Sequence, residues 1–331
     1  MARALKNARV QAQNGADSGD KKMNTNNIGS ISIYADHAEF FGISIYTDPI
    51  NRTDRTEADD TLMCMMHEEQ PCIWHTCYSY IAEAIAKSHG EIGFLDVGTG
   101  SGVFATLVAK HFPGQNILAI DKNPRAVKRA AENAKRNGVQ FNISEEFYSQ
   151  HTAPAHSCRT IGIYPPYHLY PVEYEMLVPQ HARGGWDGQR EFKNQLSKVG
   201  YHLADNGIIF FNQNCPGNEE GPAFLDYYQQ LVGGKPSMTY TEILPRIRMR
   251  EFLGYVYEGI DRPETREYIE MMCGQYEWNY LVNGIIKADG LGEVSTFIHD
   301  YDLKDVDWPY RAKIHNEISL VVEHQLRQQG K

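Results

Sequence analysis

A glycine-rich segment is the first place in this sequence where residue types and spacing could do chemistry. Residues 94–102 read F-L-D-V-G-T-G-S-G, and residues 103–110 place apolar side chains at helical spacing. This order of strand, loop and helix is typical of a nucleotide-binding α/β unit. Glycine lets the backbone pass close to a bound molecule, and the first turn of the following helix presents free N–H groups to it. We therefore predict a ligand site at this loop.

The spacing of the glycines separates two classes of nucleotide. A dinucleotide fingerprint would need glycine at position 103, but that position is Val and the third glycine is Gly102. The next apolar run, 117–120, ends in Asp121, about one strand-helix-strand crossover later. A carboxylate there can accept hydrogen bonds from both hydroxyls of a ribose. An adenosine-type ligand is therefore favoured over NAD.

The loop, the helix and Asp121 together resemble the class I S-adenosylmethionine-dependent methyltransferases, whose first motif reads D-x-G-T-G-S-G. The resemblance implies a Rossmann-like, doubly wound, mostly parallel α/β sheet of seven strands, with S-adenosyl-L-methionine as the cofactor. The residues that it assigns to cofactor binding are Asp96, Gly98, Thr99, Gly100, Gly102, Asp121, Lys122 and Tyr164. After a third predicted strand at 139–143, Glu145 and Glu146 are candidates for accepting from the adenine amino group.

A second segment with chemical potential reads I-G-I-Y-P-P-Y-H over residues 161–168. The two prolines end a strand at the carboxyl edge, where open α/β sheets bind their ligands. The segment resembles the N-P-P-Y signature of methyltransferases that modify planar amino groups, such as release-factor glutamine, ribosomal-protein glutamine and adenine N6 enzymes. Residues 121–134 and 178–188 extend the resemblance, which covers about residues 90–215 and is closest to the glutamine N-methyltransferase branch.

One position departs from that signature. Tyr164 stands where the family has Asn, and a phenol cannot reproduce a carboxamide oxygen held close to its own backbone. The carbonyl of Pro165 and the ring of Tyr167 still suit a planar or cationic amine. An acceptor other than a release-factor glutamine is therefore favoured, although plain wall packing is the alternative for both tyrosines. His168 is the candidate base for a hydroxyl or ammonium nucleophile, because histidine titrates near neutrality.

The composition narrows the classes of partner. The chain has 331 residues, 42% apolar and 22% charged, and a formal net charge of −10. Such an acidic balance disfavours a large nucleic-acid footprint. No segment approaches a membrane-spanning apolar run, so a cytoplasmic protein without membrane contact is expected.

A pair of C-x-x-H sequences lies before the glycine loop. Cys64, His67, Cys72 and His75 are ligand types that suit zinc. The interval between the two pairs is shorter than in common zinc modules, so buried thiols are favoured and no metal is predicted.

Composition and pattern suggest four parts. Residues 1–28 are expected to be a disordered tail, residues 29–89 an N-terminal cap, residues 90–258 the cofactor-binding domain, and residues 259–331 a C-terminal extension. Within the cap, residues 51–60 are either a solvated loop or a segment that closes over the cofactor. Strands are expected in 238–258 and a helix over 263–288. An amphipathic final helix is expected to serve core or dimer packing.

The function expected from the sequence is S-adenosylmethionine-dependent methylation of an amide or amine nitrogen on a protein or small molecule. Two alternatives stay open: an RNA or DNA adenine-type N-methyltransferase, and a non-catalytic cofactor-binding protein.

Overall fold

The computed structural model describes residues 31–34, 36–48, 68–88, 91–303 and 306–329. The tail expected over 1–28 and the segment 51–60, expected to be either a solvated loop or a segment that closes over the cofactor, lie outside the described residues.

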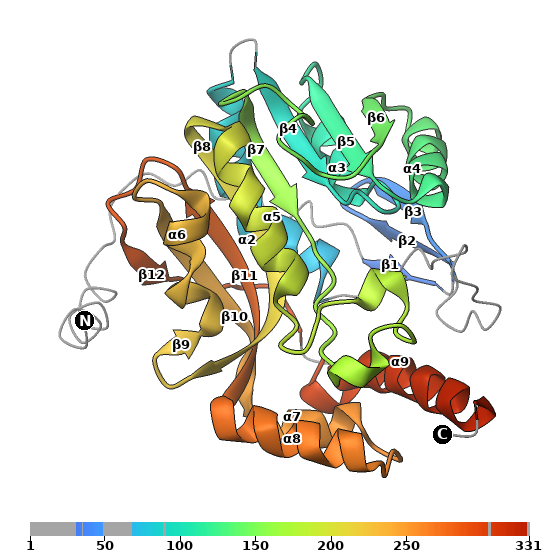
Figure 1. Ribbon diagram of the computed structural model, residues 1–331. Coiled ribbons are helices and arrows are strands. Elements are labelled where there is room, and N and C mark those ends of the chain that lie inside the picture. The colour runs from blue at the N-terminus through green and yellow to red at the C-terminus, as the bar shows by residue number, and fades with distance from the viewer. Residues whose placement is uncertain (1–30, 35, 49–67, 89–90, 304–305, 330–331) are drawn as a thin grey trace.

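A nine-stranded sheet forms the centre of the molecule, with strand order β12-β10-β11-β8-β7-β4-β5-β6 and β9 paired with β8 (Figure 1). The strands are β4 Ile92–Val97, β5 Ile117–Asp121, β6 Asn142–Glu145, β7 Cys158–Ile163, β8 Leu203–Asn218, β9 Gly221–Pro222, β10 Ser237–Arg248, β11 Trp278–Lys287 and β12 Val294–Thr296. Strands β6, β5, β4, β7 and β8 pair in parallel, and β11 runs antiparallel to both β8 and β10. The predicted mostly parallel α/β sheet is confirmed.

The predicted number of seven strands was too low. Two short strands, β9 and β12, add to the seven others by pairing with β8 and β10. Segments of two and three residues are too short for alternation of side chains to mark them in the sequence.

The sheet is buried on both faces. Neighbouring residues of β4 point to opposite sides, with Phe94 in the core shared with helices α2 Gln70–Ala86 and α3 Val103–His111. Leu95 belongs to the core shared with α5 Arg190–His202 and α6 Tyr228–Val232. This alternation is what a doubly wound sheet requires, because helices cover both of its faces.

A small N-terminal sheet packs beside the remaining helix of this region, α4 Pro124–Arg136. Its strands are β1 Ser32–Ile33, β2 His37–Phe40 and β3 Ile43–Tyr46. The carboxamide of Asn133 bonds the backbone N–H and carbonyl of Tyr46, and Asn137 does the same for Ser44. Since these asparagines are four residues apart, they lie on one side of the helix end. There their side chains hydrogen-bond the backbone of β3 as a neighbouring strand would.

The last part of the chain corrects two expectations. Strands were expected over 238–258, but the second half of that segment is the helix α7 Met249–Val256. The helix expected over 263–288 is only half present, because α8 Pro263–Gln275 ends before β11 begins at Trp278. Strand β11 is almost wholly buried between β8 and β10, so the sheet continues past residue 258. Isolated apolar runs do not distinguish a buried strand from a helix, which explains the wrong element type.

The remaining helices share a third core. Helices α7 Met249–Val256, α8 and α9 Trp308–Gln328 meet around Phe252, Met272 and Ala312, at the bottom of the view in Figure 1. The 3-10 helices are η2 Val172–Tyr174, η3 Gln180–Ala182 and η4 Ala223–Asp226. The predicted final helix serves core packing, because Ile318 and Val322 contact the cluster around Tyr174. Among the described helices, none has the length and apolar character needed to cross a membrane.

Candidate active site

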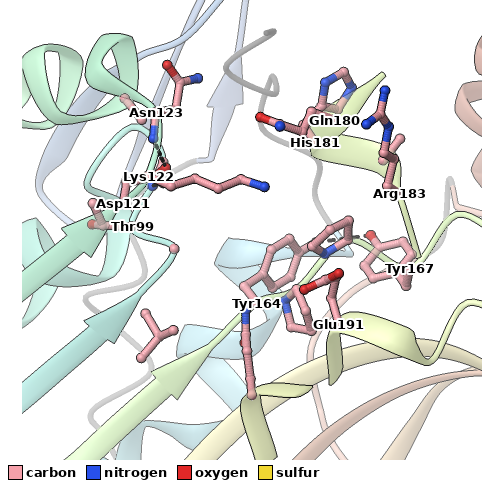
Figure 2. A pocket seen from close by; sticks show the side chains of 18 of the residues that line it. Thr99, Asp121, Lys122, Asn123, Tyr164, Tyr167, Gln180, His181, Arg183 and Glu191 are labelled. Atoms are coloured by element: carbon pink, nitrogen blue, oxygen red, sulfur yellow. Dashed lines mark hydrogen bonds between the residues drawn. The ribbon is translucent and has the colours of Figure 1, made fainter. Parts of the chain in front are cut away.

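A cavity of about 590 Å³ lies at the carboxyl ends of β4, β5 and β7. Both segments that the sequence singled out line it, with Asp121 and Lys122 on one side and Tyr164 and Tyr167 on the other (Figure 2). The lining includes every predicted site residue except Gly102 and Glu145. The topology therefore brings the two motifs to one pocket, as ligand binding at the carboxyl edge of an open sheet requires.

The glycine loop forms an open cradle. Gly98 and Gly100 have φ angles of 71° and 56°, a region that glycine enters without a steric penalty. A Cβ built on Gly98 would meet nothing within 4 Å and would instead occupy the cavity that this residue lines. Because Gly98 has no side chain, a ligand has room to lie against its backbone.

Asp121 braces this loop from the neighbouring strand. Its Oδ2 accepts from the Gly100 N–H at 2.9 Å, and its Oδ1 accepts from the Asn123 N–H at 2.9 Å. Asp121 also lines the cavity, and a carboxylate is the type of acceptor that ribose hydroxyls donate to.

Gly102 has a different role from the one expected. Its φ is 81°, and a Cβ there would lie 2.9 Å from the Cβ of Ala130 on α4. Gly102 therefore permits close packing of α4 against the loop, and it does not touch the cavity.

Asp96 and Thr99 form an internal support under the loop. The buried Asp96 carboxylate accepts from the Thr99 hydroxyl at 2.7 Å and from the Ala105 N–H at 3.1 Å. Burial raises the pKa of Asp96 to about 6, against the lowering effect of these two hydrogen bonds.

The other side of the cofactor end is more open. The Lys122 ammonium lies 5.9 Å from the centre of the Phe147 ring, and Figure 2 shows this side chain reaching across the cavity. Of the two acids proposed for the adenine amino group, Glu146 lines the cavity, whereas Glu145 is exposed and does not.

The acceptor end is a buried hydrogen-bonded cluster. The hydroxyls of Tyr164 and Tyr167 are 3.1 Å apart, and the Tyr167 hydroxyl donates to Glu69 and accepts from Arg311. Arg311 also pairs with Glu69 at 2.8 Å. Burial raises the pKa of both phenols well above the ordinary value, so both keep their protons.

His168 does not match its predicted role as a near-neutral base. The side chain is buried, and its Nδ1 lies 2.8 Å from the Nδ1 of His315, so one of these nitrogens donates to the other. Burial lowers the pKa of His168 to about 3 and that of His315 well below its ordinary value. Both imidazoles are neutral at physiological pH, because charging them inside the protein is too costly.

The segment 178–188 supports the acceptor loop from behind. The Gly184 N–H donates to the His168 carbonyl at 3.1 Å, and a Cβ at Gly184 would lie 2.6 Å from that oxygen. A Cβ at Gly188 would lie 2.6 Å from the Tyr167 carbonyl. These glycines let two backbone segments touch, which fixes the position of both residues.

Sequence reasoning missed Glu69, Gln70, Arg311 and His315. The first two immediately precede or begin α2, and the last two come from α9, more than 140 residues after Tyr164. No local motif surrounds them, so only the fold could assign them to the pocket.

The described part of the Cys and His cluster has ordinary partners. The Asn283 amide donates to Cys72 at 3.5 Å, and His75 bonds Asp300 at 2.8 Å. Cys64 and His67 lie outside the described residues. Within the described part of the chain, no three His, Cys, Asp or Glu side chains are grouped as a metal site.

Known proteins match this chain most clearly at the cofactor end. Residues 75–157 match the family model of the ribosomal protein L11 methyltransferase (PrmA). A ribosomal protein L11 methyltransferase from Symbiobacterium thermophilum is 51% identical over 67 residues, which cover 20% of this chain and 21% of that protein. A release factor glutamine methyltransferase from Flavobacterium psychrophilum is 24% identical over 199 residues, which cover 57% of this chain and 65% of that protein.

Among solved structures, M. jannaschii TYW2 in complex with AdoMet is similar with a TM-score of 0.36 and 13% identity, covering 78% of this chain and 88% of that one. The two curated relatives are matched over about a fifth and about two thirds of their own length. The strand order, the glycine loop and the sequence matches confirm the resemblance drawn from the motifs: this chain carries the cofactor-binding unit of the class I S-adenosylmethionine-dependent methyltransferases and resembles the release-factor glutamine methyltransferase branch.

Proposed function

We propose that this protein is an S-adenosylmethionine-dependent methyltransferase that methylates an amide or amine nitrogen on a protein or small molecule. The observation that carries the proposal is the shared cavity, in which the cradle at Gly98 and the carboxylate of Asp121 face the turn at Tyr164. Relatives named for ribosomal protein L11 and for a release-factor glutamine support a nitrogen acceptor on a protein.

The residues present fit the cofactor. The carboxylate of Asp121 is the kind of acceptor that suits ribose hydroxyls, and the absent side chain at Gly98 leaves space for the ligand against the backbone. Glu146 lines the cavity after β6, where an acid can accept from the adenine amine. When bound, the cofactor supplies a methyl group activated by a positively charged sulfur.

The chain itself contributes alignment and exclusion of water. Methyl displacement needs the nucleophile in line with the methyl group, and a fixed geometry lowers the barrier by removing orientational freedom. Pro165 and Pro166 stiffen the turn after β7, and the contacts of Gly184 and Gly188 hold that turn from behind. The inner wall around Tyr167 is buried, which keeps water from competing as a nucleophile.

The test is binding followed by transfer. Calorimetry with S-adenosylmethionine should give one site per chain, and purified protein with methyl-labelled cofactor should label a component of a cell extract. Digestion of the labelled fraction with protease or nuclease then assigns the acceptor to protein, nucleic acid or small molecule. Binding without any transfer would instead support a non-catalytic cofactor-binding protein, and absence of binding would contradict the proposal.

A further inference from the structure

The hydrogen bonds between the hydroxyls at the acceptor end can run in one direction only. Tyr167 has one proton, and it is used in the hydrogen bond to Glu69, while Arg311 donates to the Tyr167 oxygen. At the 3.1 Å contact between the two phenols, Tyr164 must therefore be the donor. The chain of donors runs from Tyr164 to Tyr167 to Glu69.

This direction makes the inner end of the pocket an acceptor of hydrogen bonds. Tyr164 lines the cavity and donates its proton to Tyr167, so a ligand group that hydrogen-bonds the Tyr164 oxygen must be a donor. Gln70 also lines the cavity, and its buried Oε1 has no hydrogen-bond partner among the described residues. A buried acceptor without a partner costs free energy, and a ligand with N–H groups would satisfy it.

We infer that Tyr164, Tyr167 and Glu69 form a proton relay that removes the proton released by the acceptor nitrogen during methylation. The inference rests on the proposed function and names a use for its acceptor end. The relay also explains why a phenol occupies position 164, where a carboxamide could accept a hydrogen bond but could not pass a proton on.

The steps of the relay balance. A nitrogen that has taken a methyl group carries one proton too many, and its N–H bond breaks with the electrons left on nitrogen. That proton joins the Tyr164 oxygen as the Tyr164 proton passes to Tyr167 and the Tyr167 proton passes to Oε1 of Glu69. Both phenols end neutral, and Glu69 ends as a carboxylic acid that later returns its proton to solvent.

Glu69 does not have its counter-charge to itself. Two carboxyl groups share one guanidinium, since Nη1 of Arg311 lies 2.8 Å from Glu69 and 3.7 Å from Glu68. All three side chains are at least 96% buried, so uncompensated negative charge is costly here. Burial also raises the pKa of Glu68.

Other titratable groups beside the cluster do not compete for this role. Burial raises the pKa of Cys72 and Tyr301, which face Glu68, and lowers the pKa of His168 and His315, which face Tyr167 and Arg311. All four groups therefore stay uncharged at neutral pH. The two histidines, moreover, use their Nδ1 atoms on each other.

The relay can be tested without knowing the acceptor, by NMR of the full chain labelled with carbon-13 at the tyrosine ring carbon that bears the hydroxyl. Tyr164→Phe and Tyr167→Phe assign the two signals. As the pH is changed from acid to neutral, we expect both signals to follow one shared titration curve. Glu69→Gln should remove that curve from both phenols, and Tyr167→Phe should remove it from Tyr164.

Tyr257→Phe is the matched control, because this buried phenol donates to the Leu169 carbonyl and does not line the cavity. It should delete one signal and leave the shared curve intact. Two signals that titrate independently, or a curve that persists in Glu69→Gln, would overturn the relay. If Glu69→Gln does not fold, Tyr167→Phe decides alone. Calorimetry with S-adenosylmethionine on the same samples separates the two proposals: intact binding without a shared curve overturns the relay, and absent binding overturns the proposed function.

Discussion

The two ends of the pocket are built in opposite ways. The cofactor end comes from one continuous stretch, 96–123, in which each brace joins neighbouring strands or a loop to its own helix. The acceptor end joins Glu69, Tyr167 and Arg311, which are separated by 98 and 144 residues. The family match over 75–157 covers the first end and stops before the second. A local motif therefore specifies cofactor binding, whereas acceptor chemistry depends on segments that only the fold brings together.

The largest effect should come from removing the cation of the acceptor end. Arg311→Leu leaves Glu68 and Glu69 buried with no counter-charge from this position, and we expect a loss of about 3–5 kcal/mol of unfolding free energy. Denaturant unfolding measures it. The matched control is Arg250→Ala, because the Arg250–Glu270 pair is exposed and solvent screens it. Equal effects of the two substitutions would show that the cluster carries no special stability.

Asp96, which supports the cofactor loop from below, should make the unfolding free energy depend on pH. The folded protein raises the pKa of Asp96 from 3.8 to about 6, so the folded state binds this proton more tightly than the unfolded chain. The stabilisation is complete below the ordinary pKa and is lost as the pH rises through about 6. Asp96→Asn should remove this loss and gain up to about 3 kcal/mol near neutrality.

Unfolding free energies measured across that pH range check the expectation for Asp96. The control is Asp226→Asn, which changes an exposed acid outside the pocket. Parallel pH profiles of wild type and Asp96→Asn would contradict the assignment.

Asp121 tests whether the ribose is held where the loop is braced. Asp121→Ala removes a charged acceptor and the brace on the Gly100 N–H, so we expect roughly 10- to 100-fold weaker binding of S-adenosylmethionine by calorimetry. Asp226→Ala is the comparison. Unchanged affinity in Asp121→Ala would place the ribose elsewhere.

The smallest expected effect comes from comparing two glycines, one that lines the cavity and one that does not. Gly98 and Gly259 have φ angles of 71° and 80°, and a Cβ on either would meet nothing within 4 Å. Alanine at either position should cost about 1 kcal/mol of stability, because the backbone is left-handed. Only Gly98 lines the cavity, so only Gly98→Ala should weaken cofactor binding. Equal binding by both variants would show that the ligand does not approach Gly98.

Sequence reasoning succeeded where a property is local. The start of α4 is specified by its own residues, because Asn123 caps it by accepting from the Arg125 N–H and Pro124 suits its first turn. Sequence reasoning failed where the role of a residue or the type of an element depends on a segment that packs against it. Gly102 is required by Ala130 of α4, and the strand β11 is a strand because β8 and β10 flank it.

The sequence alone determined the parallel α/β plan, the cofactor loop and the meeting of two motifs at one sheet edge, because strand periodicity and glycine spacing act over a few residues. Only the tertiary structure decided the acceptor end. It buried His168 beside His315, which lowers the pKa of this predicted base far below neutrality, and it brought α9 and the start of α2 against Tyr167. Burial and charge pairing depend on what packs around a side chain, and residues separated by most of the chain supply that packing here.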